Sequence, residues 1–407
     1  MSKDKNKLIP ELRFPEFEKE GEWEYLNGDE LFEPISNKNH NSDLPILAIT
    51  QEQGAIPREM IDYHVSVTDR SIESYKIVEE GDFIISLRSF QGGIEYSNYI
   101  GLCSPAYIIL RKKIDVVNDL YRHYFKSSPF IQDLNRNLEG IRDGKMVSYK
   151  QFSEILIPKP QNLEQQKIAT CLSSLDELIA AHNDKLLALK DHKKGMMQNL
   201  FPQDGEKEPK FRFPEFEDDG EWQKKKLGNE DVSNLVNEKI ASNTLRLDTY
   251  ISTENLLSDY SGINIATKLP PAGRVTRFLE GDMLISNIRP YLKKVWRSDR
   301  QGGASNDVLV FRSGSAVKSD FLEFILKNDA FINFVMQSAK GVKMPRGDKG
   351  SMQKYPVFIP SIEEQQKIAS CLSALDELIT AQSEKIEQLQ LHKKGLMQGL
   401  FPKNVNV

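Results

Sequence analysis

Several loops of this chain combine arginine and lysine with glycine and aromatic or polar side chains. The richest, residues 287–303, reads NIRPYLKKVWRSDRQGG and carries five basic residues against one aspartate, a local excess of +4. Its counterpart in the first half of the chain is LRSFQGG at 87–93. Arginine and lysine contact phosphates and guanine edges, glutamine reads adenine, and glycine lets the backbone approach a surface closely. Such loops are suited to reading the groove of a nucleic acid.

Two further loops of this kind, at 140–152 and 340–350, each precede the last predicted strand of their half. A single charged loop is usually just solvated, so the prediction depends on the recurrence of these loops at equivalent places in both halves. The residues predicted to bind DNA are Arg88, Ser89, Gln91, Arg142, Lys145 and Ser148 in the first half, and Arg289, Tyr291, Lys293, Lys343, Arg346 and Lys349 in the second. This choice rests on charge and loop position alone.

The segments that resemble catalytic or metal-binding motifs each depart from the consensus at an essential position. The segment 140–145, GIRDGK, has three residues between its glycines where a phosphate-binding loop has four, and Met146 stands where Ser or Thr must meet magnesium. The segment 104–107, SPAY, lacks the second proline of the loop with which amino-methyltransferases hold a flipped base. The six histidines form neither HxH nor HExxH, and the three cysteines form no CxxC. We therefore expect a chain that is not itself an enzyme and that holds no metal or cofactor.

The elements that must position these loops occur twice. Residues 164–202 and 364–402 align without a gap, and 26 of their 39 positions are identical. The opening segments RFPEFEKEGEW (13–23) and RFPEFEDDGEW (212–222) share 9 of 11 positions, whereas most of the sequence in between does not match. Two long repeats indicate a duplicated domain rather than a solenoid of short repeats. A duplication that serves stability alone is an alternative, but it would constrain the divergent bodies as much as the tails.

Both tails have the periodicity of a coiled-coil helix, with seam positions that recur in alternating steps of four and three. The seam residues are Ile168, Leu172, Leu175, Ile179, His182, Leu186 and Leu189 in the first tail, and Ile368, Leu372, Leu375, Ile379, Gln382, Ile386 and Leu389 in the second. A helix of this length forms a rod of roughly 55 Å at 1.5 Å per residue. Because one exposed seam is not stable alone, we expect the two helices to pair with each other. An antiparallel pair would bring His182 and Gln382 together and hold the two bodies at opposite ends.

Each body mixes short strand-like runs with helical stretches. The predicted strands are 44–50, 82–87, 106–110 and 155–157 in the first body, and 283–287, 308–311 and 357–359 in the second; the predicted helices are 120–134 and 321–337. The fold class is therefore α+β (mixed α/β), with two bodies in tandem repeat and two long helices.

Length and composition agree with this division. A chain of 407 residues exceeds one ordinary core, and 39% apolar with 28% charged residues is typical of a soluble protein. No membrane-spanning run or signal peptide is evident in the sequence, so we expect a cytoplasmic protein. The predicted divisions are 1–160 for the first body, 161–202 for the first helix, 203–360 for the second body, 361–402 for the second helix and 403–407 for a short tail.

The repeated motifs resemble those of one known family. RFPEF and GEW at the start of each half, EQQKIA and LDELI at the start of each tail and HKKG followed by LFP at its end are similar to the specificity subunit of type I restriction–modification systems. The resemblance implies that each body is a target-recognition domain for one half of a bipartite site on double-stranded DNA. It also implies that the helices set the spacing and dock two methyltransferase (modification) subunits, through which restriction subunits join. The methyl donor and ATP would belong to those partners.

Two alternatives stay open from the sequence. One is a coiled-coil scaffold that presents two protein-binding domains and never contacts DNA. The other is a self-sufficient DNA methyltransferase or nuclease, which would need motifs that the sequence lacks. The net charge of −5 is an objection to DNA binding, and we expect partner subunits to supply much of the positive surface.

Overall fold

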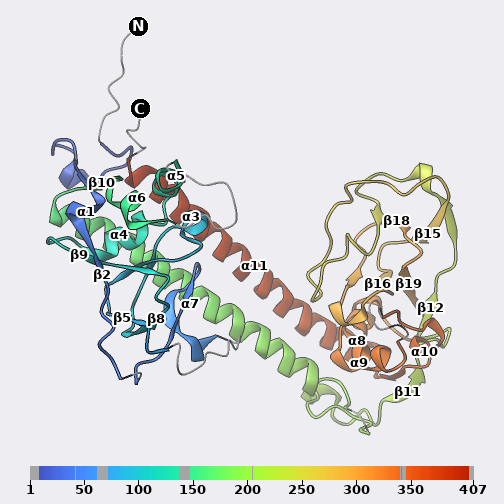
Figure 1. Cartoon of the computed structure of the whole chain (residues 1–407). Coiled ribbons are helices and arrows are strands. Elements are labelled where there is room, and N and C mark those ends of the chain that lie inside the picture. The colour runs from blue at the N-terminus through green and yellow to red at the C-terminus, as the bar shows by residue number, and fades with distance from the viewer. Residues whose placement is uncertain are drawn as a thin grey trace. The chain divides into compact units, whose positions relative to one another are not determined.

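Two long helices, α7 (Asn162–Asn199) and α11 (Ile362–Leu400), dominate the computed structural model of this chain (Figure 1). The structure describes residues 9–41, 43–61, 72–136, 147–203, 205–339, 341 and 345–402. The chain divides into two units, and both helices are shared between them. Unit 1 comprises residues 1–183 and 384–407, and unit 2 comprises residues 184–383.

The seam predicted from the sequence is the buried side of both helices. Every seam residue from Ile168 to Leu189 and from Ile368 to Leu389 is buried or half-buried, while most of the residues around them are exposed. Each helix begins two residues after a proline, Pro160 or Pro360, and ends before a Phe-Pro pair, because proline cannot continue the hydrogen-bond ladder.

Within each unit, the start of one helix packs beside the end of the other, in opposite directions. In unit 1, Ile168 and Leu172 of α7 share a core with Leu400 and Phe401 at the end of α11. In unit 2 the roles exchange, and the end of α7 enters the core that holds the start of α11. The expected antiparallel arrangement is therefore present inside each unit. The meeting of His182 with Gln382 stays a prediction.

The body of unit 1 is built on an antiparallel sheet with the strand order β2-β9-β6-β7, accompanied by the pairs β1–β10, β3–β4 and β5–β8. Its strands are β1 (Glu24–Asn27), β2 (Phe32–Ile35), β3 (Leu47–Thr50), β4 (Gly54–Pro57), β5 (Lys76–Val78), β6 (Phe83–Ile85), β7 (Glu95–Tyr96), β8 (Gly101–Cys103), β9 (Ile108–Lys112) and β10 (Leu156–Lys159). Its shorter helices are η1 (Pro15–Phe17), α1 (Gly28–Leu31), η2 (Arg58–Met60), α3 (Ser89–Gly92), α4 (Asn118–Tyr124), α5 (Ser128–Arg136) and α6 (Tyr149–Ser153).

The body of unit 2 repeats this plan with the strand order β12-β19-β16-β17, a pair β11–β20 and a second sheet in the order β13-β15-β18-β14. Its strands are β11 (Gln223–Lys226), β12 (Ser233–Leu235), β13 (Lys239–Ala241), β14 (Tyr250–Ile251), β15 (Arg274–Phe278), β16 (Met283–Ser286), β17 (Val295–Arg297), β18 (Gly302–Ala304), β19 (Val308–Ser313) and β20 (Pro356–Ile359). Its shorter helices are η3 (Pro214–Phe216), η4 (Ser242–Thr244), η5 (Pro290–Leu292), α8 (Ser319–Leu326), α9 (Asp329–Gln337) and α10 (Lys349–Met352). The α+β fold class is confirmed.

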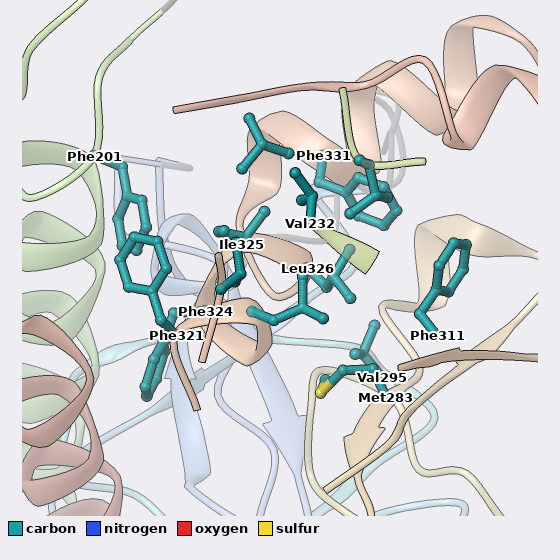
Figure 2. Close-up of a cluster of buried hydrophobic side chains, with 14 of the residues drawn as sticks. Phe201, Val232, Met283, Val295, Phe311, Phe321, Phe324, Ile325, Leu326 and Phe331 are labelled. Carbon is teal, nitrogen blue, oxygen red and sulfur yellow. The ribbon is translucent and has the colours of Figure 1, made fainter. Parts of the chain in front are cut away.

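Aromatic side chains join the helix ends to the bodies. In unit 1, the ring of Phe401 lies edge-on to Tyr124 of α4 with centroids 5.3 Å apart. In unit 2, Phe201 stacks on Phe321 of α8 at 5.4 Å, and Figure 2 shows this pair at the edge of the buried cluster. The repeated LFP motif that ends each tail therefore supplies a core residue as well as a helix stop.

Each of the two predicted body helices is broken into two. Residues 120–134 form α4 and α5, and residues 321–337 form α8 and α9. Pro129 disfavours continuation of the first helix, and the side chain of Asn328 accepts a hydrogen bond from the Ala330 N–H at 2.9 Å, which caps the start of α9. The predicted helical stretches are confirmed, and the break within each was not predicted because apolar periodicity continues across it.

Candidate nucleic-acid interface

A buried carboxylate fixes the start of each long helix to the opening segment of its unit. The two oxygens of Glu164 accept hydrogen bonds from the Arg13 guanidinium, both at 2.8 Å, and the Trp23 indole N–H donates to the same carboxylate at 3.1 Å. In unit 2, Arg212 donates to Glu364 at 2.8 and 2.7 Å. The hydrogen bonds to these carboxylates raise the pKa of both arginines. The repeated RFPEF and EQQK motifs therefore form one bidentate ion pair in each unit.

The glutamine after each buried glutamate connects the helix to its body. Gln165 accepts a hydrogen bond from the Val117 N–H at 2.9 Å and donates to the Pro160 carbonyl at 2.7 Å. Gln365 does the same with Lys318 N–H and the Pro360 carbonyl, at 2.9 and 3.1 Å. Because the side-chain amide of each glutamine is buried and bonded at both ends, the direction in which each body leaves its helix is fixed.

A Gly-Asp pair in each body forms the turn before the strand that leads to a predicted loop, and the aspartate anchors the start of that strand. Gly81 has a φ of 93° and Gly281 a φ of 83°, a region that suits glycine. Asp82 accepts two hydrogen bonds from Arg111, both at 2.8 Å, and Asp282 accepts two from Arg312 at 2.8 and 2.7 Å. Each aspartate precedes β6 or β16, and the predicted DNA-binding loop follows that strand. The loops therefore start from a fixed point.

The loop after β6 presents only part of its predicted set. Arg88 and Gln91 are exposed. Ser89 is 1% exposed, and its hydroxyl accepts a hydrogen bond from the Ser86 N–H at 2.9 Å. Ser89 therefore has a structural contact that holds the turn, and its predicted role in DNA binding is not supported by its position.

In the second predicted segment of unit 1, residues 140–152, Ser148 is the predicted DNA-binding residue that lies within the described part. Its hydroxyl accepts a hydrogen bond from the Gln151 N–H at 3.2 Å and caps α6. Arg142 and Lys145 lie outside the described residues. The counterpart cap in unit 2 is Asp348, which accepts from the Ser351 N–H at 2.7 Å.

The loop after β16 lies beside the segment 345–347. The Arg289 N–H donates to the Pro345 carbonyl at 2.8 Å, and the Gly347 N–H donates to the Asn287 carbonyl at 3.0 Å. The structure thus brings the loop that carries Arg289 and Tyr291 beside Arg346, which the sequence predicted in a separate segment. Arg289 and Tyr291 are exposed, the latter by 48%.

Most of the positive charge predicted for this loop is balanced by acidic neighbours. Lys293 pairs with Asp329 at 2.6 Å, Arg297 with Glu323 at 2.6 Å, Arg300 with Asp299 at 2.5 Å and Arg346 with Asp307 at 3.1 Å. Lys349 is exposed at the start of α10, and Lys343 lies outside the described residues. Asp299 is already included in the local excess of +4 counted from the sequence, so Asp329 and Glu323, which come from distant segments, reduce that excess by two charges to about +2.

A cavity in unit 1 lies where the body meets both long helices, and His123, Asp176 and Lys393 line it. His123 of α4 has a 4% exposed side chain, with a ring nitrogen 3.2 Å from the Ser173 hydroxyl and the other 3.8 Å from Asp176. Asp176 of α7 is paired with Lys393 of α11. Burial and the nearby Lys393 lower the pKa of His123 to about 4, so the imidazole is neutral at pH 7 and its approach to Asp176 is not an ion pair.

Sequence reasoning missed the residues that hold the frame. The repeats contain these residues, which are Arg13, Glu164 and Gln165 with their counterparts in unit 2, but no contact was predicted for them from the sequence. The signal was available, because charged residues that are identical in otherwise divergent repeats are more consistent with buried contacts than with a solvated surface. The three cysteines are free, and none of the described residues form a cluster of metal-ligating side chains.

Comparison with known proteins identifies the class. The fold is that of a tandemly duplicated protein with two α+β bodies and two long helices, and the family model for the type I restriction modification DNA specificity domain matches residues 22–191 and 279–391. The chain belongs to this family, as the resemblance predicted.

Similar proteins cover nearly the whole chain. The type I restriction enzyme MjaVIII specificity subunit of Methanocaldococcus jannaschii is 23% identical over 97% of this chain and 95% of its own length. The type I restriction–modification S subunit from M. genitalium has a similar fold, with a TM-score of 0.56, 14% identity, and coverage of 97% of this chain and 99% of that one. A chain from a structural study of assembly and conformational transition in the type I R–M system matches at a TM-score of 0.55 with 15% identity, over 93% and 97% of the two chains. Among the helices described, none is long and apolar enough to cross a membrane.

Proposed function

We propose that this chain is the sequence-reading subunit of a type I restriction–modification complex. The body of each unit reads one half of a bipartite site on double-stranded DNA, and α7 and α11 set the distance between the half-sites. The observation that carries this proposal is the contrast within the repeat. The contacts that join body to helix recur in both units, while the exposed loops after β6 and β16 differ in sequence and conformation.

The catalytic steps belong to partner subunits in this proposal. Two copies of a methyltransferase subunit dock on the helices, the restriction subunits join through that core, and the methyl donor and ATP are bound by these partners in the cytoplasm. Exposed leucines at equivalent places on the two helices, Leu178 at 43% and Leu378 at 54%, support docking of two copies of one partner. Such partners would also supply the positive surface that a chain with a net charge of −5 lacks.

The proposal is tested by mixing the full chain with its methyltransferase partner, a labelled methyl donor and duplex DNA. We expect methylation confined to one split sequence, and no methylation by either protein alone. Exchanging residues 24–155 for another body should alter one half-site only. Methylation by the partner alone at the same sequence, or a complex that binds no DNA, would instead favour the protein-binding scaffold.

The spacing role has its own test. Insertion of one heptad into α7 lengthens the helix by about 10 Å, which corresponds to roughly three base pairs of duplex. We expect the gap between the half-sites to change while both half-sites stay the same. A variant that keeps the gap and changes the bases read contradicts this role.

A further inference from the structure

We propose that Arg289 is a guanine-reading residue of unit 2, held in place by a strained segment that carries Tyr291 beside it. The inference rests on the proposed function, because it requires that the chain reads DNA. It goes further by separating the residues that contact a base from the residues that only position them.

The strained backbone of the described chain is concentrated at this one place. Four described residues other than glycine have a positive φ: Asp259 at 51°, Tyr260 at 60°, Arg289 at 51° and Lys293 at 53°. The left-handed region is unfavourable for residues with a Cβ, and such strain persists where the surrounding contacts enforce it, which is often at binding sites.

The two strained segments hold each other. The Asp259 N–H donates to the Leu292 carbonyl and the Tyr260 N–H to the Lys293 carbonyl, both at 3.0 Å. Lys293 also pairs with Asp329 at 2.6 Å and lies 6.0 Å from the centre of the Tyr260 ring. Lys293 was predicted to bind DNA, but its contacts make it a positioning residue.

The first part of the loop is fixed from the other side. The Asn287 N–H donates to the Asp307 carbonyl at 2.8 Å, and the Arg289 N–H donates to Pro345 at 2.8 Å. Arg346, which pairs with Asp307, forms a backbone bridge with Ile288. Since both flanks of Arg289 are bonded to other segments, the segment that carries its side chain is fixed before any ligand arrives.

What this segment leaves for a ligand is one guanidinium and one phenol. Arg289 is exposed, and no carboxylate among the described residues lies within ion-pairing distance of it. Tyr291 is 48% exposed. Two residues before Arg289, the side-chain oxygen of Asn287 is one of six buried side-chain atoms among the described residues that have no hydrogen-bond partner, and an unmet buried acceptor beside this loop is available to a ligand.

The chemistry of an unpaired, rigidly mounted arginine selects the ligand. Its planar fork can donate two parallel hydrogen bonds to O6 and N7 of guanine, the commonest specific base contact in the major groove. A lysine ammonium can also donate to these guanine atoms, but it is a point charge on a flexible stem and lacks the fixed fork of the guanidinium. In unit 1 the counterpart Arg88 has an ordinary φ of −112°, so the preformed reader is a property of unit 2.

The test compares variants in the complex of the full chain with its methyltransferase partner. The substrates are duplexes in which each position of the wild-type methylated sequence is changed in turn. For Arg289→Ala we expect discrimination to fall by about 10- to 100-fold at one G·C pair of a single half-site. Arg289→Lys keeps a donor for guanine without the fixed fork, so its discrimination should fall between that of Arg289→Ala and that of the wild type. Arg300→Ala, which removes an arginine already paired with Asp299 in the same unit, serves as the matched control and should leave every position unchanged.

Arg289→Gly guards against a folding artefact. Glycine accepts the positive φ without strain, so this variant should be at least as heat-stable as the wild type and should still lose the guanine preference. An equal loss of methylation on all duplexes would mean a phosphate contact and would overturn the inference, as would unchanged discrimination at every position. If the wild-type complex methylates no split sequence at all, the proposed function fails instead.

Discussion

Unit 1 and unit 2 keep the same contacts where body meets helix and differ where the bodies face outward. The Arg13–Glu164 and Arg212–Glu364 pairs have matching geometry, and Gln165 and Gln365 bond to equivalent backbone groups. The difference lies in the loops, since unit 2 strains four residues to fix Arg289 while unit 1 holds the turn with the hydroxyl of Ser89. The contacts between body and helix must therefore satisfy the same buried carboxylate and amide in both units, whereas the loops do not share this requirement and can differ.

The frame itself is not perfectly symmetric. Trp23 donates its indole N–H to Glu164, whereas the indole nitrogen of Trp222 is buried without a partner among the described residues. Glu364 therefore depends more strongly on its arginine than Glu164 does. Loss of the arginine should therefore destabilise unit 2 more than unit 1.

The largest effect is expected for Arg212→Ala. Removal of one partner from a buried ion pair leaves an uncompensated charge and costs about 3–5 kcal/mol of unfolding free energy. Arg13→Ala should cost about 1 kcal/mol less, because Glu164 keeps the hydrogen bond from Trp23. Hydrogen exchange of peptides from each unit measures both losses separately. The control is Lys207→Ala, which breaks the exposed pair with Glu221 and should change the unfolding free energy little. Equal losses of unfolding free energy for Arg212→Ala and Arg13→Ala would show that the hydrogen bond from Trp23 contributes nothing.

Periodicity and repetition predicted the helices and the fold class because both depend on local patterns. The alternating steps from Ile168 to Leu189 require a helix whatever it packs against. The breaks at Pro129 and Asn328 were missed because apolar spacing continues through them, although proline and asparagine were themselves local signals.

The sequence predicted which segments form the candidate interface, but not the contacts between these segments. The sequence places Arg289 in a basic loop, but the neighbours that neutralise Lys293 and Arg346 come from Asp329 and Asp307, and the opposing strained pair begins at Asp259. Such contacts join segments that lie far apart in the chain, so charge counted along the sequence overestimates charge in space. The division of the chain into reading domains and spacer helices, and the DNA-binding role of each residue, stay predictions.

The second effect concerns the junction of α4 with the long helices. His123 lies beside Asp176 and Lys393 in unit 1, whereas Lys193 of unit 2 pairs with Asp376 and lies 5.6 Å from the ring centre of Phe324. A phenylalanine therefore fills in unit 2 the place that a histidine fills in unit 1, and only unit 1 carries a titratable ring there.

This difference predicts a pH dependence confined to unit 1. The pKa of His123 is lowered from 6.5 to about 4 by burial first and by Lys393 second, with Arg122 adding to and Asp176 opposing the shift. The unfolded chain therefore takes up the proton first. Stability is fully present above about pH 6.5 and falls as the pH drops toward 4, by about 3 kcal/mol in total.

His123→Phe should remove this loss, because it installs the side chain that unit 2 already uses. Urea unfolding at pH 7.5 and pH 4.5, followed in unit 1 by hydrogen exchange, compares the variant with the wild type. Phe324→His is the matched change in unit 2 and should introduce the acid sensitivity there. If the wild type and His123→Phe lose the same stability on acidification, protonation of His123 is not its source.

The smallest expected effect separates a capping role from a reading role at Ser148. Its hydroxyl caps α6 as the Asp348 carboxylate caps α10, and loss of such a cap costs about 1 kcal/mol. Ser148→Ala should therefore lower the unfolding free energy of unit 1 by that amount and leave the methylated sequence unchanged, whereas Ser148→Asp, which copies the cap of unit 2, should restore the stability. Thermal unfolding and sequencing of methylated DNA measure the two properties. A changed half-site with unchanged stability would return Ser148 to the set of DNA-contacting residues, because capping and base contact make opposite demands on the direction of one hydroxyl.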